Sequence, residues 1–156
     1  MESHKISNNN AFTLVETLIV MSLVLVITSF GFVMSKGDFM RNNLRDEVSV
    51  INSLLVRARN QSINTMCFGD SCVGGKKHGV YITEHSYVLF QGDSYLTRDV
   101  SEDEIVYPKR LIVITGLQEI VFELLSGSSK TPGNIVLSDE NANTYTVSIN
   151  TEGVII

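Results

Sequence analysis

The apolar residues of this chain are most concentrated in one uninterrupted run near its beginning. Residues 17–35 contain no charged side chain, and most of them are Leu, Ile, Val, Met or Phe. A helix of this length, at about 1.5 Å of rise per residue, matches a hydrocarbon layer about 30 Å thick. The pattern therefore predicts that residues 12–35 form a helix that crosses a membrane once.

A second pattern follows the apolar run. Apolar or small residues recur there at spacings of three and four, at Met40, Leu44, Val48, Ile51, Leu55, Ala58 and Ser62. Polar residues fill most of the positions between them, as in an amphipathic helix with one buried face. We expect residues 36–63 to continue the first helix and to pack this face on a folded head.

Short runs of β-branched and aromatic residues occupy most of the remaining sequence. Residues 79–84 and 87–91 are spaced as the two strands of a hairpin, and further runs lie at 104–107, 110–115, 119–125, 134–137, 145–150 and 153–156. Turn-forming residues separate the later runs. A long helix followed by consecutive strands predicts an α+β fold, in which the helix packs on an antiparallel β-sheet head formed by residues 64–156.

One acidic residue, Glu16, lies just inside the start of the apolar run. A carboxylate costs about 2.5–3.5 kcal/mol at the centre of a membrane helix and less near its end, so such a residue usually meets a partner. We therefore expect Glu16 to pair with a cation. The alternative is that Glu16, about one turn inside the run, lies at the membrane interface without a role.

The residues before the run form a short polar leader that ends in a small residue, Ala11. In a secretory signal peptide the cleavage site follows the apolar region, whereas here the small residue precedes it. A cut after Ala11 would remove residues 1–11 and keep the membrane helix.

The segment Phe12-Thr13-Leu14-Val15-Glu16, with its leader and apolar run, resembles the signal of type IV pilins and type II secretion pseudopilins. The resemblance implies that a prepilin peptidase cuts between Ala11 and Phe12 and that Phe12 is then N-methylated. It also implies that Glu16 pairs with the N-terminal amine of a neighbouring subunit during assembly. The chain departs from the family pattern at Ala11, where glycine is usual.

The order of elements in the head resembles that of GspH/FimT-type minor pseudopilins. The similar segments are residues 57–63, Gly-Val-Tyr-Ile and Tyr-Val-Leu-Phe in the first hairpin, Ile-Val-Phe-Glu, and the closing Tyr-Thr-Val-Ser-Ile-Asn. The resemblance implies a minor structural subunit of a type IV pilus or a type II secretion pseudopilus. Its partners would be other pilins or pseudopilins, through the helix, and the inner-membrane assembly platform.

The resemblance also implies the membrane topology. The protein is expected to cross the cytoplasmic (inner) membrane once, with its head outside the cytoplasm, and to join a filament on that side later. Charge alone indicates the opposite orientation, because Lys36, Arg41 and Arg45 follow the run and only Lys5 precedes it.

Two other functions remain open, namely a DNA-binding minor pilin for DNA uptake and a membrane-anchored adhesin or receptor outside any filament. The net charge of −5 and the pI of about 5.1 argue against extensive nucleic-acid binding. The last six residues contain no Lys or Arg, and the short basic run Lys76-Lys77 is typical of a solvated turn. DNA is therefore not the favoured partner.

Two cysteines, Cys67 and Cys72, follow the predicted helix, with Gly69 between them. Outside the cytoplasm such a pair favours a disulfide. The alternative, a metal site that combines them with His78 and His85, lacks the paired spacing of structural zinc sites. We therefore predict no metal and no cofactor. The sequence contains none of the common hydrolase or phosphate-loop motifs, so an enzyme is not expected.

Overall fold

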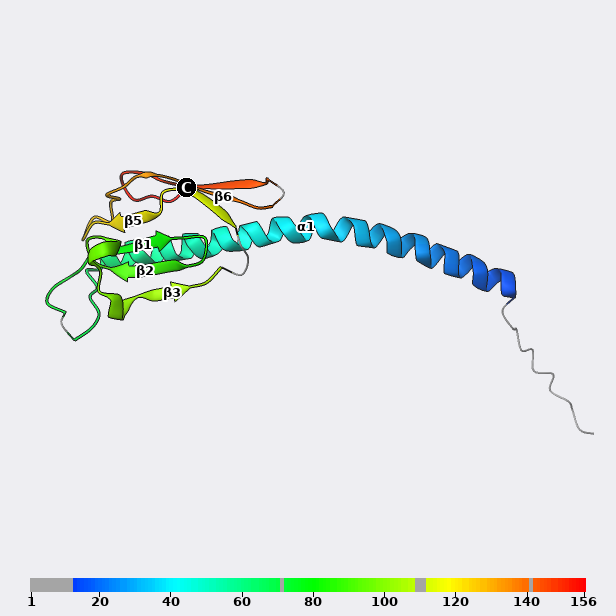
Figure 1. Ribbon diagram of the computed structural model, residues 1–156, viewed down its shortest axis with the longest axis horizontal. Coiled ribbons are helices and arrows are strands. Elements are labelled where there is room, and N and C mark those ends of the chain that lie inside the picture. The colour runs from blue at the N-terminus through cyan, green and yellow to red at the C-terminus, as the bar shows by residue number, and fades with distance from the viewer. Residues whose placement is uncertain (1–12, 71, 109–111, 141) are drawn as a thin grey trace, which may run out of the picture. The chain divides into compact units, whose positions relative to one another are not determined.

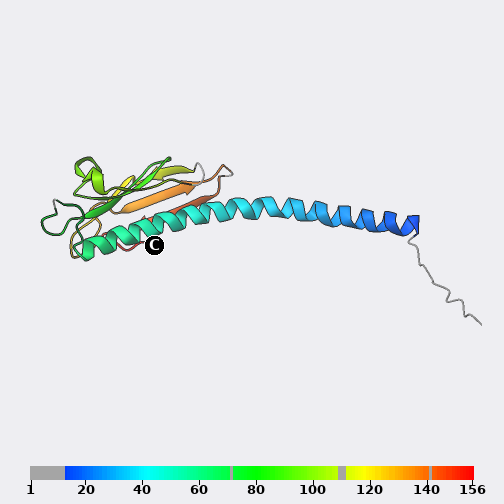
Figure 2. The same ribbon diagram turned by 90° about the horizontal axis from the view of Figure 1, so that it is seen from below.

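The computed structural model describes residues 13–70, 72–108, 112–140 and 142–156, and for residues 30–43 it describes the backbone alone. The chain divides into two compact units, Met1–Phe39 and Met40–Ile156. A single helix, α1 (Leu14–Ile63), contributes residues to both units. The strands belong to the second unit, where they gather along the carboxyl-terminal part of α1, coloured cyan to green (Figure 1, Figure 2).

The carboxyl end of α1 is closed by backbone hydrogen bonds. The Met66 N–H donates to the Gln61 carbonyl at 2.9 Å, and the Thr65 N–H donates to the Ser62 carbonyl at 3.1 Å. Thr65 has φ 51°, which is the left-handed conformation required at this position of a Schellman cap. The helix therefore ends abruptly and sends the chain back toward the sheets.

The seven strands found in the described residues form two antiparallel sheets. The larger sheet has the order β3-β2-β1-β5 and the smaller has the order β4-β6-β7. Their bounds are β1 His78–Ile82, β2 Tyr87–Gln91, β3 Glu104–Val106, β4 Val113–Gly116, β5 Glu119–Phe122, β6 Gly133–Ser138 and β7 Thr144–Ile149. Two 3-10 helices, η1 (Tyr95–Thr97) and η2 (Val100–Glu102), lie between β2 and β3. The predicted α+β arrangement of a helix on antiparallel strands is confirmed.

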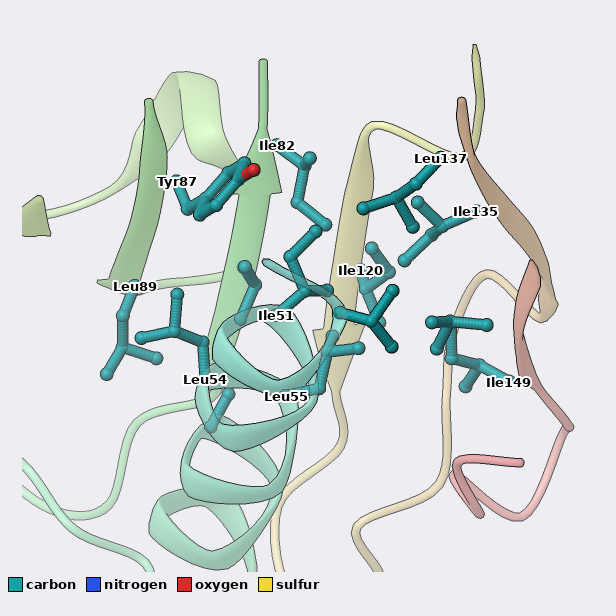
Figure 3. Close-up of a cluster of buried hydrophobic side chains, with 14 of the residues drawn as sticks. Ile51, Leu54, Leu55, Ile82, Tyr87, Leu89, Ile120, Ile135, Leu137 and Ile149 are labelled. Carbon is teal, nitrogen blue, oxygen red and sulfur yellow. The ribbon is translucent and has the colours of Figure 1, made fainter. Parts of the chain in front are cut away.

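One apolar core joins α1 to both sheets (Figure 3). Ile51, Leu55 and Ala58 of α1 are completely buried. The larger sheet faces them with Ile82, Tyr87, Leu89 and Ile120, and the smaller sheet with Ile135, Leu137 and Ile149. The predicted buried face of α1, hereafter the stripe, is confirmed from Leu44 to Ser62, because each of its residues in this range is buried. The side chain of Met40 lies outside the described residues.

The structure buries one charged residue of α1 that the stripe omits. Glu47 is 3 % exposed, and the phenolic hydroxyl of Tyr87 donates to its Oε2 at 3.3 Å. Burial and the neighbouring Glu47 carboxylate raise the pKa of Tyr87, so the hydroxyl keeps its proton. This contact fastens α1 to β2.

The single sheet expected from the sequence is in fact divided between β4 and β5. Only two residues, Leu117 and Gln118, separate these strands, yet β4 pairs with β6 and β5 pairs with β1. Gly116 has φ 95°, and a Cβ at this position would collide with the Asn134 carbonyl oxygen. This glycine lets the chain leave one sheet and enter the other, so the two strands do not form a hairpin.

Candidate functional site

Residues 14–27 of the first unit form an apolar helix with no covered side. Every apolar side chain from residue 14 to residue 27 is exposed, with exposed fractions from 51 % at Val20 to 77 % at Leu14. These residues surround the helix rather than forming a stripe. A helix that is apolar all round requires lipid or other apolar helices as its surroundings.

The hydroxyl groups of this segment are compatible with apolar surroundings. Thr17 donates to the Leu14 carbonyl at 2.9 Å, and Ser22 to the Ile19 carbonyl at 2.8 Å. Thr28 and Ser29 likewise donate to carbonyls of the preceding turn at 2.8 and 2.7 Å. Because these hydroxyls are satisfied within the helix, they can enter an apolar environment without losing hydrogen bonds.

Glu16 occupies the first turn of α1, immediately after the helix cap. Its backbone N–H donates to Thr13 Oγ1 at 3.3 Å, so Thr13 caps the helix. The pattern Thr13-x-x-Glu16 is that of a capping box, which is a local signal for the start of this helix. The negative charge of Glu16 also lies at the end of the helix where the macrodipole favours it.

Within the described residues, no cation lies at ion-pair distance from Glu16. The predicted cation must therefore come from another molecule or from the part of the chain outside the described residues. Ala11 and Phe12, the predicted cleavage and methylation residues, lie outside the described residues, as does the rest of the leader. These assignments stay predictions.

Among the residues that the structure describes, no helix is both long and apolar enough to cross a membrane.

Cys67 and Cys72 are joined by a disulfide, with their Cα atoms 5.8 Å apart. Gly69, which has φ 90°, provides the turn within the loop, where the Cys72 N–H donates to its carbonyl at 3.3 Å. The buried side chain of Gln91 holds the same loop, since it accepts from the Phe68 N–H at 2.9 Å and donates to the Phe68 carbonyl at 2.8 Å. The loop after α1 is thus fixed both by the bridge and by the end of β2.

The two histidines of the head have different surroundings. His78 is 2 % exposed at the start of β1 and lies edge-on to Phe68, whereas His85 is exposed in the β1–β2 turn. Burial lowers the pKa of His78 to about 4, although the backbone of Lys76 partly opposes this effect. In the described parts of the chain, no three His, Cys, Asp or Glu side chains are grouped so that they could hold a metal ion.

One lysine of the basic run before β1, Lys77, forms ion pairs. Lys77 Nζ lies 2.8 Å from Glu123 Oε2 and 3.2 Å from Asp93 Oδ1, and its side chain is only 23 % exposed. The hydrogen bond to Glu123 is the main cause that raises the pKa of Lys77. Its charge is therefore engaged with neighbouring carboxylates rather than presented to an anionic ligand.

Comparison with known proteins identifies one signal in the chain. Residues 6–32 match the prokaryotic N-terminal methylation motif, which is typical of type IV pilins and pseudopilins. No curated protein matches the chain, and no solved structure matches it. The α+β arrangement of a helix on antiparallel sheets is pilin-like, and proteins of this kind are generally structural rather than enzymatic.

The matched motif implies processing by a prepilin peptidase and assembly with pilins. It also implies that the amino-terminal helix anchors the protein in the inner membrane before assembly. The motif covers Thr13, Glu16 and the exposed apolar residues of α1, so the signal and the uncovered helix are the same segment.

Proposed function

We propose that this protein is a minor pilin or pseudopilin of the GspH/FimT type, a structural subunit that takes part in assembling a type IV pilus or a type II secretion pseudopilus. The observation that carries the proposal is the first part of α1, residues 14–27, which exposes apolar side chains on every side and has self-satisfied hydroxyls. In the proposed division, residues 1–11 are a removed leader, 12–35 the membrane and assembly helix, 36–63 its amphipathic half, and 64–156 the head.

In this proposal, Glu16 sets the axial position of each subunit relative to its neighbour during assembly. Lipid tails are as apolar as leucine, so apolar surface alone provides little preference between membrane and filament. Cleavage before Phe12 would create a new amine at the start of the helix, and this amine on one subunit would pair with Glu16 of the next. Opposite charges attract far more strongly in an apolar environment than in water. The pairing therefore favours the filament and fixes the axial position of the subunit.

The head of the protein is proposed to lie outside the cytoplasm. The core of the head lies within Met40–Ile156. The head can therefore fold without a contact from the apolar helix. The disulfide between Cys67 and Cys72 is consistent with an oxidising compartment. The proposed partners are the prepilin peptidase, other pilins or pseudopilins and the inner-membrane assembly platform.

Fractionation of filaments tests the proposal. In cells that contain the peptidase and the assembly machine, we expect the cut chain, without residues 1–11, to appear in the sheared filament or pseudopilus fraction. In a matched strain without the peptidase, the chain should remain in the membrane at its uncut mass. Uncut protein in the filament fraction, or cut protein that never leaves the membrane fraction, would contradict the proposal.

A further inference from the structure

Among the residues that the structure describes, the outer edge of β7 is unpaired over half of its length. β7 is the last strand in the order β4-β6-β7, and β6 pairs with one side of it. On the other side, Ser148 and Ile156 exchange two backbone hydrogen bonds of 2.9 Å. Backbone groups of alternate residues point to the same side of a strand, so Thr144 and Thr146 point outward with Ser148. No described residue pairs with the backbone of Thr144 or Thr146 on that side.

This edge lacks the features by which proteins usually protect an exposed strand. β7 reads Thr-Tyr-Thr-Val-Ser-Ile, without a charged residue or a proline, and residues 144–146 are all exposed. The face of the smaller sheet that carries Thr144 and Thr146 is equally uncharged. By register its members are Val113, Thr115, Asn134, Val136, Ser138, Thr144, Thr146 and Ser148. An uncharged edge of this kind is a template for another strand.

A groove of about 380 Å³ lies beside the open edge, between β7 and α1. Tyr145 lines it from β7, and Arg45, Val48, Ser49 and Asn52 line it from α1. Arg45 is exposed and forms no ion pair with a described residue. Asn52 Oδ1 is buried without a hydrogen-bond partner in the described part of the chain. Arg45 is thus the one charged side chain among the described residues that line the groove.

We propose that a strand of another protein adds to the smaller sheet along residues 144–146 and places an acidic side chain over this groove. Backbone hydrogen bonds to Thr144 and Thr146 supply the affinity, and alternate side chains supply the specificity. Side chains of neighbouring strands point to the same face where residues are directly opposite, so the residue opposite Tyr145 lies on the groove side. The charge of Arg45 favours a carboxylate at that position.

The requirement for an acidic side chain also distinguishes the proposed partner from a second copy of this chain that pairs through its own β7. β7 itself contains no Asp or Glu, so a β7–β7 pair would leave Arg45 of both copies without a carboxylate from the added strand. The short segment 154–156 already pairs along the same edge at Ser148, so strand addition extends a pairing that the fold contains.

Peptide titration of the isotope-labelled full chain in detergent micelles, followed by NMR, tests the proposal. The probes are two short peptides of alternating threonine and valine that differ only in a central aspartate or lysine. We expect the aspartate peptide to shift the amide resonances of Thr144, Tyr145 and Thr146 and to bind up to about fivefold more tightly, the range of an exposed ion pair. Shifts confined to other parts of the chain, or equal affinity for both peptides, would overturn the proposal.

Two variants check the edge and the charge separately. Thr146→Pro removes a backbone N–H that points away from β6, so it should leave the sheet intact and weaken binding about fivefold or more, whereas Thr146→Val should bind like the original chain. Arg45→Glu should reverse the preference to the lysine peptide. Unchanged binding by the proline variant would overturn the proposal, and so would an unreversed preference in Arg45→Glu. Resonances of β7 that shift on dilution without peptide would indicate pairing between copies of this chain and would also overturn the proposed partner.

Discussion

Glu16 takes part in two separate interactions, the capping of α1 and the proposed pairing with an amine. The hydrogen bond from its backbone N–H to Thr13 Oγ1 belongs to the capping of α1, in which a glutamate or a glutamine side chain at this position can take part. Its negative charge belongs to the proposed pairing with the amine of Phe12 on a neighbouring subunit. Capping requires no charge, whereas the pairing does, so one substitution can separate the two effects.

We predict that Glu16→Gln keeps the helix cap but reduces incorporation into filaments at least about tenfold, as the loss of an ion pair of about 1.4 kcal/mol would. Removal of the leader should be largely unaffected in this variant and in Glu16→Ala. Quantitative immunoblotting of membrane and filament fractions measures both effects. Normal incorporation of Glu16→Gln would show that capping, not pairing, is the role of this residue.

His78 makes the stability of the head depend on pH. Its pKa is about 4 in the folded protein and about 6.5 in an unfolded chain, because burial disfavours the charged ring. Between these pH values the unfolded state binds more protons, so acid favours unfolding. We expect the head to lose up to about 3 kcal/mol of stability from this residue as the pH falls from about 6.5 to about 4.

Urea denaturation followed by tyrosine fluorescence at several pH values measures this loss. In His78→Phe the dependence on pH should be flatter over this range, whereas the exposed control His85→Phe should behave like the original chain. If His78→Phe keeps the full loss of stability in acid, another group is responsible for it.

At the scale of elements, α1 is held to the head by the buried stripe. We predict that Ile51→Ala or Leu55→Ala lowers the free energy of unfolding of the head by about 2–5 kcal/mol, because each leaves a cavity at a fully buried position. The control Val56→Ala, at a position that is 47 % exposed, should change it by less than about 0.5 kcal/mol. Urea denaturation of the full chain in detergent measures both, and similar losses in all three variants would contradict the packing described here.

The elements with a strong local pattern could be predicted from the sequence. The spacing of Leu44, Val48, Ile51, Leu55 and Ala58 has the period of a helix, and these residues are the face that α1 buries. Alternating apolar residues and turn residues likewise located the strands to within a few positions, except that the run predicted at 153–156 forms only an isolated bridge at Ile155. Local pattern therefore sufficed for the α+β fold.

Features that depend on tertiary contacts could not be predicted in this way. A glutamate in an amphipathic helix is usually solvated, and nothing near Glu47 in the sequence indicates that Tyr87 will reach it. Strand alternation likewise does not state which strands pair, so the change of sheet at Gly116 and the open edge at Thr146 required the structure. In the candidate site, both the signal around Glu16 and the uninterrupted apolar run were readable because they are local, whereas the contacts of the head were not.

At the scale of the whole molecule, the two compact units have opposite characters. Residues 14–27 of the first unit bury none of their apolar side chains, whereas the second unit has a core that joins α1 to two sheets. A chain built in this way requires an external apolar environment for one unit only. Lipid before assembly and neighbouring helices after it are the two environments that the proposed function provides.

The mass of the mature amino terminus tests this account most directly, because the pairing of Glu16 requires a free amine at the start of the helix. Protein purified from membranes and filaments of cells that contain the prepilin peptidase should be measured by mass spectrometry after proteolysis. The account predicts an amino-terminal peptide that begins with N-methylated Phe12. An amino-terminal peptide that still begins with Met1 in such cells would contradict it.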